Sequence, residues 1–167
     1  SGTWVPELGD LLPEDEATSM ALVSQSSTDT NGISKFTVDV TRPDGTPVVT
    51  GEVKWVNADS TIGNGTKIWV AQDNSYNWNI YQCTQVPGRL TQVVDNLNGT
   101  SRAVFSSTVN LVAGDLIIVR YFNTAVDGVS RVLSRLSINT AVIEYAFNNS
   151  NQTSLTGNGI VLDRKST

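Results

Sequence analysis

Hydrophobic and polar residues alternate along much of this chain. Phe36, Val38 and Val40 are separated by single polar residues, Thr37 and Asp39. A period of two places successive side chains on opposite faces of an extended strand. This segment therefore predicts a β-strand with one apolar face.

Turn signals divide the rest of the chain into short segments. Pro43-Asp44-Gly45 combines residues that favour a tight turn, and Asn98-Gly99 is a strong hairpin signal. The run Leu116–Val119 is apolar on both faces, which predicts a strand buried on both sides. Strands are predicted over residues 33–40, 48–56, 67–72, 78–83, 90–94, 103–109, 116–122, 129–138 and 141–147.

This pattern predicts the fold class and the domain boundaries. About eight to ten antiparallel strands with frequent turns are typical of an all-β protein, a β-sandwich or jelly roll. Residues 1–32 are turn-rich and predict an irregular N-terminal lead-in, with one short helix over Glu14–Val23. Residues 33–147 form the predicted β jelly-roll domain, and residues 148–167 form a polar C-terminal arm or loop.

The composition excludes several kinds of catalytic site. The 167 residues include no histidine, so a Ser-His-Asp triad, a Cys-His pair or a histidine-bearing zinc site is impossible. Cys83 is the one cysteine, which rules out an intrachain disulfide. Glu52 and Glu144 lie within predicted strands and are the plausible inward-facing acids for a glycosidase pair, whereas most other carboxylates lie in predicted turns. We therefore expect no enzymatic activity, no cofactor and no metal.

The charge and hydropathy of the chain exclude further partners. The net charge is -5, and no basic face of the kind that binds nucleic acid is visible. No apolar stretch approaches the ~20 residues that span a bilayer, and no signal-peptide pattern is present. Only 16% of the residues are charged, and a surface covered by Ser, Thr, Asn and Gln is common in extracellular and virion-surface β proteins. We therefore expect no nucleic acid, no membrane insertion and a virion-surface or extracellular location.

An aromatic-rich segment gives the best candidate for a ligand site. Five aromatic residues are interleaved with Asn and Asp between positions 55 and 81. A flat ring can cover the C–H face of a sugar while amides bind its hydroxyls. A second interpretation, favoured for any single tryptophan, is that Trp55, Trp69 and Trp78 fill the core between two sheets. The predicted ligand contacts are Asp73, Asn74, Tyr76 and Asn77, with Trp78 next and Tyr76 the best candidate for an exposed ring.

Residues 109–119, Val-Asn-Leu-Val-Ala-Gly-Asp-Leu-Ile-Ile-Val, combine a strand, a Leu-x-x-Gly-Asp turn and an apolar strand. This resembles the corresponding element of C1q/TNF-like jelly rolls, which form the heads of many phage and viral fibres. The opening segment Gly2-Thr3-Trp4-Val5-Pro6 is similar to segments that begin phage tail-fibre modules. The first resemblance covers residues 104–147 and implies a homotrimer. Ile117, Val119 and Tyr121 would then form the subunit contact.

Three functions fit these observations. The first is a viral or phage surface domain that attaches to a host receptor, a glycan being the expected ligand, and that needs no catalytic residue. The second is a structural protruding domain of a capsid that serves particle assembly. The third is a monomeric carbohydrate-binding module of a secreted protein.

Overall fold

The computed structural model describes residues 2–9, 20–24, 27–28, 32–41, 47–57, 62, 66–73, 75–148 and 151–165. Within these residues the protein contains strands and turns but no helix, which confirms the predicted all-β class. Accordingly, none of this described part forms a helix able to cross a membrane. The chain divides into two compact units, Ser1–Cys83 and Thr84–Thr167, so the boundaries expected near residues 33 and 147 are not those of the compact units.

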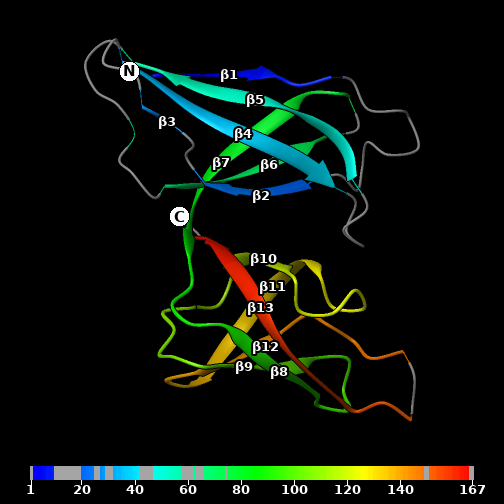
Figure 1. Cartoon of the computed structure of the whole chain (residues 1–167). Coiled ribbons are helices and arrows are strands. Elements are labelled where there is room, and N and C mark those ends of the chain that lie inside the picture. Colours follow the sequence, from blue (N-terminus) through cyan, green and yellow to red (C-terminus); the bar gives the residue numbers. More distant parts are fainter. Residues whose placement is uncertain are drawn as a thin grey trace. The chain divides into compact units, whose positions relative to one another are not determined.

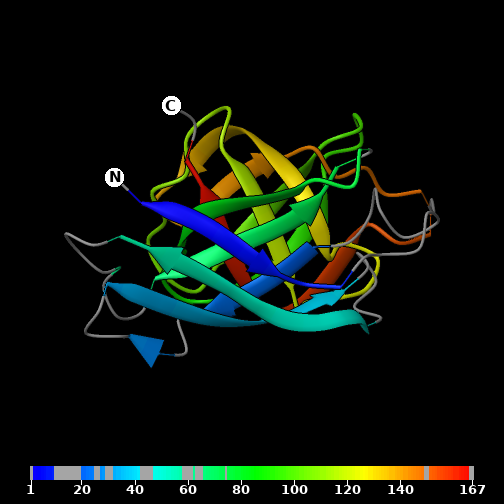
Figure 2. The ribbon, with the colours of Figure 1, turned by 90° about the horizontal axis from the view of Figure 1, so that it is seen from above.

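Unit 1 is an antiparallel sheet with the strand order β1-β5-β4-β2-β6-β7, and β3 pairs with β4 (Figures 1 and 2). Its strands are β1 (Thr3–Glu7), β2 (Met20–Ser24), β3 (Ser27–Thr28), β4 (Ile33–Thr41), β5 (Pro47–Val56), β6 (Lys67–Gln72) and β7 (Trp78–Gln85). The helix expected over 14–23 is wrong in its last part, because residues 20–24 form β2 and pair with β6. Residues 14–19 lie outside the described residues.

The alternation in β4 places its apolar side chains in the core of unit 1. Phe36, Val38 and Val40 are fully buried, whereas Thr37 and Asp39 are exposed, as the sequence predicts. The same cluster includes Val53 of β5 and Ile68 and Val70 of β6. Side chains from three strands therefore form one apolar cluster that excludes water.

Unit 2 is a closed six-stranded barrel (Figure 1). Its strands are β8 (Leu90–Asp95), β9 (Ser101–Phe105), β10 (Leu116–Arg120), β11 (Gly128–Ser137), β12 (Thr140–Ile143) and β13 (Ser154–Arg164). They follow the antiparallel order β8-β9-β12-β11-β10-β13, and β13 pairs with β8 to close the ring. The last two residues of β7, Thr84 and Gln85, belong to unit 2 and pair with Asp163 and Leu162 of β13.

Strand β13 closes the barrel by pairing along both of its edges. Its last residues, Ile160–Arg164, pair with β10, and its first residues pair with β8 across a register shift between Thr156 and Gly159. Glycines at this bend let Phe122 approach the backbone, since a Cβ at Gly159 would lie 2.6 Å from the Cβ of Phe122. The arm or loop expected over 148–167 is therefore a core strand at residues 154–164.

Alternation along β10 and β13 determines which side chains enter the barrel. Ile117, Val119 and Val161 belong to the core cluster of unit 2 and are essentially inaccessible to solvent. The side chains of Ile117 and Val119 are therefore not available to a partner subunit in this conformation. Tyr121, immediately after β10, is 70% exposed and is accessible.

We predict that Ile117→Ala lowers the free energy of unfolding by about 2–5 kcal/mol, because it empties a packed site in the barrel core. Tyr121→Ala is the matched control and should change this free energy by about 0.5 kcal/mol or less, because it truncates an exposed side chain. Denaturant unfolding measures both. If Ile117→Ala leaves stability unchanged but lowers the solution mass, the residue is a subunit contact and its placement in the barrel core is wrong.

Candidate functional site

The predicted ligand-binding loop connects β6 and β7, whose end residues Gln72 and Trp78 are paired. The backbone N–H of Asp73 donates to the carbonyl of Asn77 at 3.0 Å, and that of Tyr76 donates to the carbonyl of Asp73 at 3.1 Å. The loop is therefore a hydrogen-bonded continuation of the hairpin. Asn74, also predicted as a contact, lies outside the described residues.

The carboxylate of Asp73 organises this loop. Its Oδ1 accepts hydrogen bonds from the backbone N–H of Ser75 at 2.8 Å and of Asn77 at 3.0 Å. Its Oδ2 accepts from the side-chain amide of Asn79 at 3.3 Å. The backbone N–H groups, that of Asn77 first, lower the pKa of Asp73 below its ordinary value because they stabilise the ionised form. Asp73 is thus a positioning residue in this geometry, with one oxygen bonded to the loop backbone and the other to Asn79 of β7.

Tyr76 is held in a conformation that a large residue rarely adopts. Its φ is 63°, in the left-handed region, and its side chain is 44% exposed. Such a backbone costs of the order of 1–3 kcal/mol and persists only where neighbouring contacts impose it. Here the buried amide of Gln72 donates to the carbonyl of Tyr76 at 2.9 Å. The exposed ring of Tyr76 therefore projects from a strained backbone that is held by hydrogen bonds.

The tryptophans have mainly packing roles. Trp69 is buried, and Trp55 and Trp78 are half-buried against the core cluster of unit 1. Trp55 also packs on Trp4 with ring centroids 5.0 Å apart. The interpretation of these tryptophans as core residues therefore accounts for them, while Tyr76 and Asn77 are exposed at the loop. Trp78 adjoins the loop and joins it to the core.

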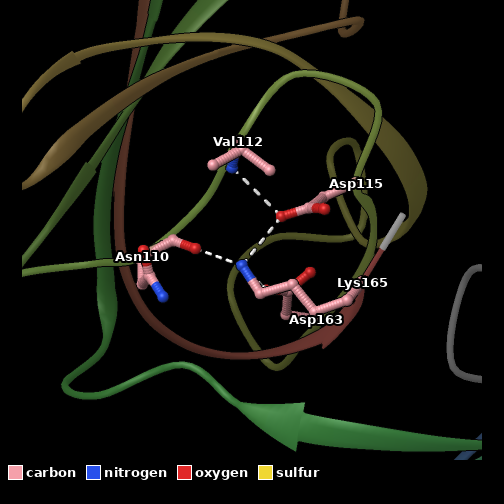
Figure 3. A network of polar contacts seen from close by, with 5 residues as sticks. All are labelled: Asn110, Val112, Asp115, Asp163 and Lys165. Carbon is pink, nitrogen blue, oxygen red and sulfur yellow. Dashed lines mark hydrogen bonds and ion pairs between the residues drawn. The ribbon is translucent and has the colours of Figure 1, made fainter. Parts of the chain in front are cut away.

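A second group of polar residues lies at the end of β13 in unit 2 (Figure 3). Asp115 is fully buried, and its Oδ2 accepts hydrogen bonds from the backbone N–H of Val112 and from Nζ of Lys165, both at 3.0 Å. The Nζ of Lys165 also contacts Asp163 Oδ2 at 2.9 Å and donates to the carbonyl of Asn110. We name Asp115, Asp163 and Lys165 the β13 clamp.

The charged groups of the β13 clamp stabilise one another as ion pairs. Burial raises the pKa of Asp163, and the hydrogen bond from Lys165 offsets this only in part. Burial by itself lowers the pKa of Lys165, but hydrogen bonds to Asp163 and Asp115 outweigh it and the pKa is raised. The amine is therefore held as an ammonium, which is neither a nucleophile nor a base. The Gly114-Asp115 turn is visible in the sequence, but no local signal links Asp115 to Asp163 or to Lys165, which lies 50 residues later.

The two candidate acids, Glu52 and Glu144, are both exposed. Glu52 lies in β5, and Glu144 follows β12. The sequence makes Glu52 one of the two plausible inward-facing acids, but alternation along β5 places Val53 in the core and leaves Glu52 at the surface. Among the described residues no three His, Cys, Asp or Glu side chains are grouped to hold a metal ion.

The structure also shows strained residues that sequence patterns did not indicate. Besides Tyr76, the residues Leu97 and Tyr121 have a φ of 63° and 62°. Leu97 is 81% exposed at the tip of the β8–β9 hairpin, and Tyr121 follows β10. A left-handed backbone at a Leu or Tyr is imposed by the geometry of the turn, and the residue type does not predict it.

Comparisons of this chain with protein-family models, curated proteins and solved structures found no match. The similarity of residues 104–147 to C1q/TNF-like jelly rolls stays a prediction.

We predict that the order of the 73–77 loop depends on ionised Asp73. Because the pKa of Asp73 is lowered on folding, its contribution is complete above the unfolded value of about 3.9 and is lost as the pH falls through the folded value. Hydrogen exchange at the amides of Ser75 and Asn77 should lose protection in that acidic range. Asp73→Ala should lose it at neutral pH, and undiminished protection in this variant would contradict the assigned role.

Removing the ammonium of the β13 clamp should destabilise unit 2. Lys165→Ala removes the ammonium that pairs with the buried carboxylates of Asp115 and Asp163. We expect the free energy of unfolding to fall by about 1–3 kcal/mol. Lys54→Ala is the matched control, since it breaks the exposed pair with Glu7 at 2.8 Å, and exposed ion pairs stabilise little. Equal effects of the two substitutions in denaturant unfolding would show that the clamp does not stabilise the barrel.

Proposed function

We propose that this protein is a non-enzymatic recognition module on a viral or phage surface, which attaches to a host receptor by binding a glycan through the Asp73–Trp78 loop. The observation that carries the proposal is the exposed ring of Tyr76 on a loop fastened by Asp73. Asn74 is included in the proposed site from the sequence alone. The other contacts are Asn77, and Trp78 at the base of the loop.

The chemistry of the loop suits a sugar. The ring of Tyr76 offers an apolar face for the C–H groups of a pyranose and a hydroxyl for its polar edge. The exposed amide of Asn77 can donate to and accept from sugar hydroxyls. Because the loop is already hydrogen-bonded without a ligand, binding loses little conformational entropy in ordering it.

Two further features support attachment rather than catalysis. The chain has no histidine, and its candidate acids Glu52 and Glu144 are exposed and lie in different units. The resemblance over residues 104–147 favours a fibre or spike head assembled as a homotrimer, in which Tyr121 is the accessible member of the expected contact. Three copies would let weak glycan contacts sum to a useful avidity.

The same loop would also serve a monomeric carbohydrate-binding module. The exposed ring of Tyr76 favours both functions equally. The two differ in assembly, because the module needs one copy and the attachment head presents several. A structural protruding domain, in contrast, needs no ligand at this loop.

Tyr76→Ala should weaken glycan binding by about 30-fold, which corresponds to the ~2 kcal/mol typical of an aromatic hot spot. Binding to a glycan array, followed by titration calorimetry with the best ligand, measures the loss. The folded state should be retained, since the side chain is exposed.

Leu97→Ala is the matched control, because Leu97 is also a large exposed residue with a left-handed backbone but belongs to unit 2 and to no proposed contact. It should leave the affinity of a single site unchanged. If the protein binds no glycan, or if Tyr76→Ala binds as well as the parent protein, the loop is not the attachment site.

A further inference from the structure

The β8–β9 hairpin ends in an exposed Asn-Gly pair. Asn98 and Gly99 lie at its tip, and a Cβ at Gly99 would meet no atom within 4 Å. We propose that Asn98 is a site of spontaneous deamidation, at which the backbone nitrogen of Gly99 converts the side-chain amide to an aspartate or isoaspartate. This modification is independent of the proposed glycan site, which lies in unit 1.

The geometry of the turn prepares the amide for attack. The Oδ1 of Asn98 accepts hydrogen bonds from the backbone N–H of Thr100 at 3.1 Å and from its hydroxyl at 2.6 Å. Attack on the amide carbon moves negative charge onto this oxygen, and two fixed donors stabilise such a charge. The bonds that fasten the turn use the N–H groups of Asn96, Leu97 and Thr100, so the nitrogen of Gly99 is not among their donors.

The reaction needs only water and a base from the solvent. The Gly99 nitrogen loses its proton and forms a bond to Cγ of Asn98, while the bond from Cγ to Nδ2 breaks. The amide nitrogen takes up a proton and leaves as ammonia, which closes a succinimide ring. Water then opens the ring at either carbonyl. Glycine favours ring closure because it has no Cβ to crowd the attacking nitrogen and because its backbone rotates most freely.

The product would change the hairpin tip. A carboxylate replaces a neutral amide in the hairpin that also holds Asp95, whose Oδ1 accepts from the N–H of Leu97. The isoaspartate form also lengthens the main chain by one carbon within a turn closed by the bond from Asn96 N–H to Thr100 at 3.0 Å. The modification therefore adds negative charge and reshapes the surface around exposed Leu97.

The chain contains its own control for this inference. Asn158-Gly159 has the same two residues but lies inside β13. Gly159 is buried, it pairs with Leu90, and a Cβ placed on it would lie 3.2 Å from the carbonyl of Arg120. Ring closure there requires the barrel strand to distort. The asparagines of the pairs at 31–32 and 64–65 lie outside the described residues.

The experiment incubates the full chain at mildly alkaline pH and follows each Asn-Gly peptide by mass spectrometry, with isoaspartate detected by enzymatic methylation. In the folded protein, Asn98 should deamidate at least several-fold faster than Asn158. In denaturant, where both pairs are unstructured, the two rates should converge. An Asn158 rate equal to or above that of Asn98 in the folded protein would overturn the proposal, as would an Asn98 that reacts only after unfolding.

Two variants separate the sequence effect from the turn geometry. Asn98→Gln should abolish the reaction at this position, because a six-membered ring closes far more slowly. Thr100→Val keeps the backbone N–H but removes the hydroxyl donor, and it should slow the reaction several-fold in the folded protein and not in denaturant. An unchanged rate in folded Thr100→Val would show that the hydroxyl does not activate the amide.

Discussion

The pairing of β13 along both edges is the constraint on which unit 2 depends. Buried backbone groups need hydrogen-bond partners, and a closed barrel supplies them without leaving an open edge. One strand can face β10 with its last residues and β8 with its first because it bends at a register shift, where glycines lie against Phe122. The β13 clamp fastens the end of this strand to the turn before β10.

In unit 1, the carboxylate of Asp73 holds one loop in place by accepting hydrogen bonds from its backbone. Asp73 satisfies two backbone N–H groups that the turn would otherwise leave to water, and the Tyr76 ring is presented as a consequence. The left-handed backbone at Tyr76 is retained because the hairpin beneath it is fixed by paired strands. A rigid, fastened aromatic is well suited to recognition, since binding then requires little reordering.

Sequence patterns predicted correctly those features that depend on residues close together in the chain. The period of two in β4 placed Phe36 and Val38 in the core, and the Gly114-Asp115 turn was correctly predicted from its residues. The all-β fold class and the exposure of Tyr76 in its loop could therefore be predicted from the sequence. Strand β13 did not, because its Thr, Asn and Gly residues resemble a loop and its pairing to β8 joins residues sixty positions apart. For the same reason, apolar alternation could not show that Ile117 and Val119 face the inside of a barrel rather than a partner subunit.

The proposed recognition depends on contact between a glycan and the hydrogen-bonded Asp73–Trp78 loop. The most direct test is an NMR titration of the isotope-labelled protein with host-cell oligosaccharides, following every backbone amide. We expect concentration-dependent shifts confined to the amides of Ser75, Tyr76, Asn77 and Trp78 and to the Tyr76 ring, with the barrel of unit 2 unaffected. Shifts centred on Leu97 or Tyr121, or none in the presence of ligands that bind, would contradict the claim.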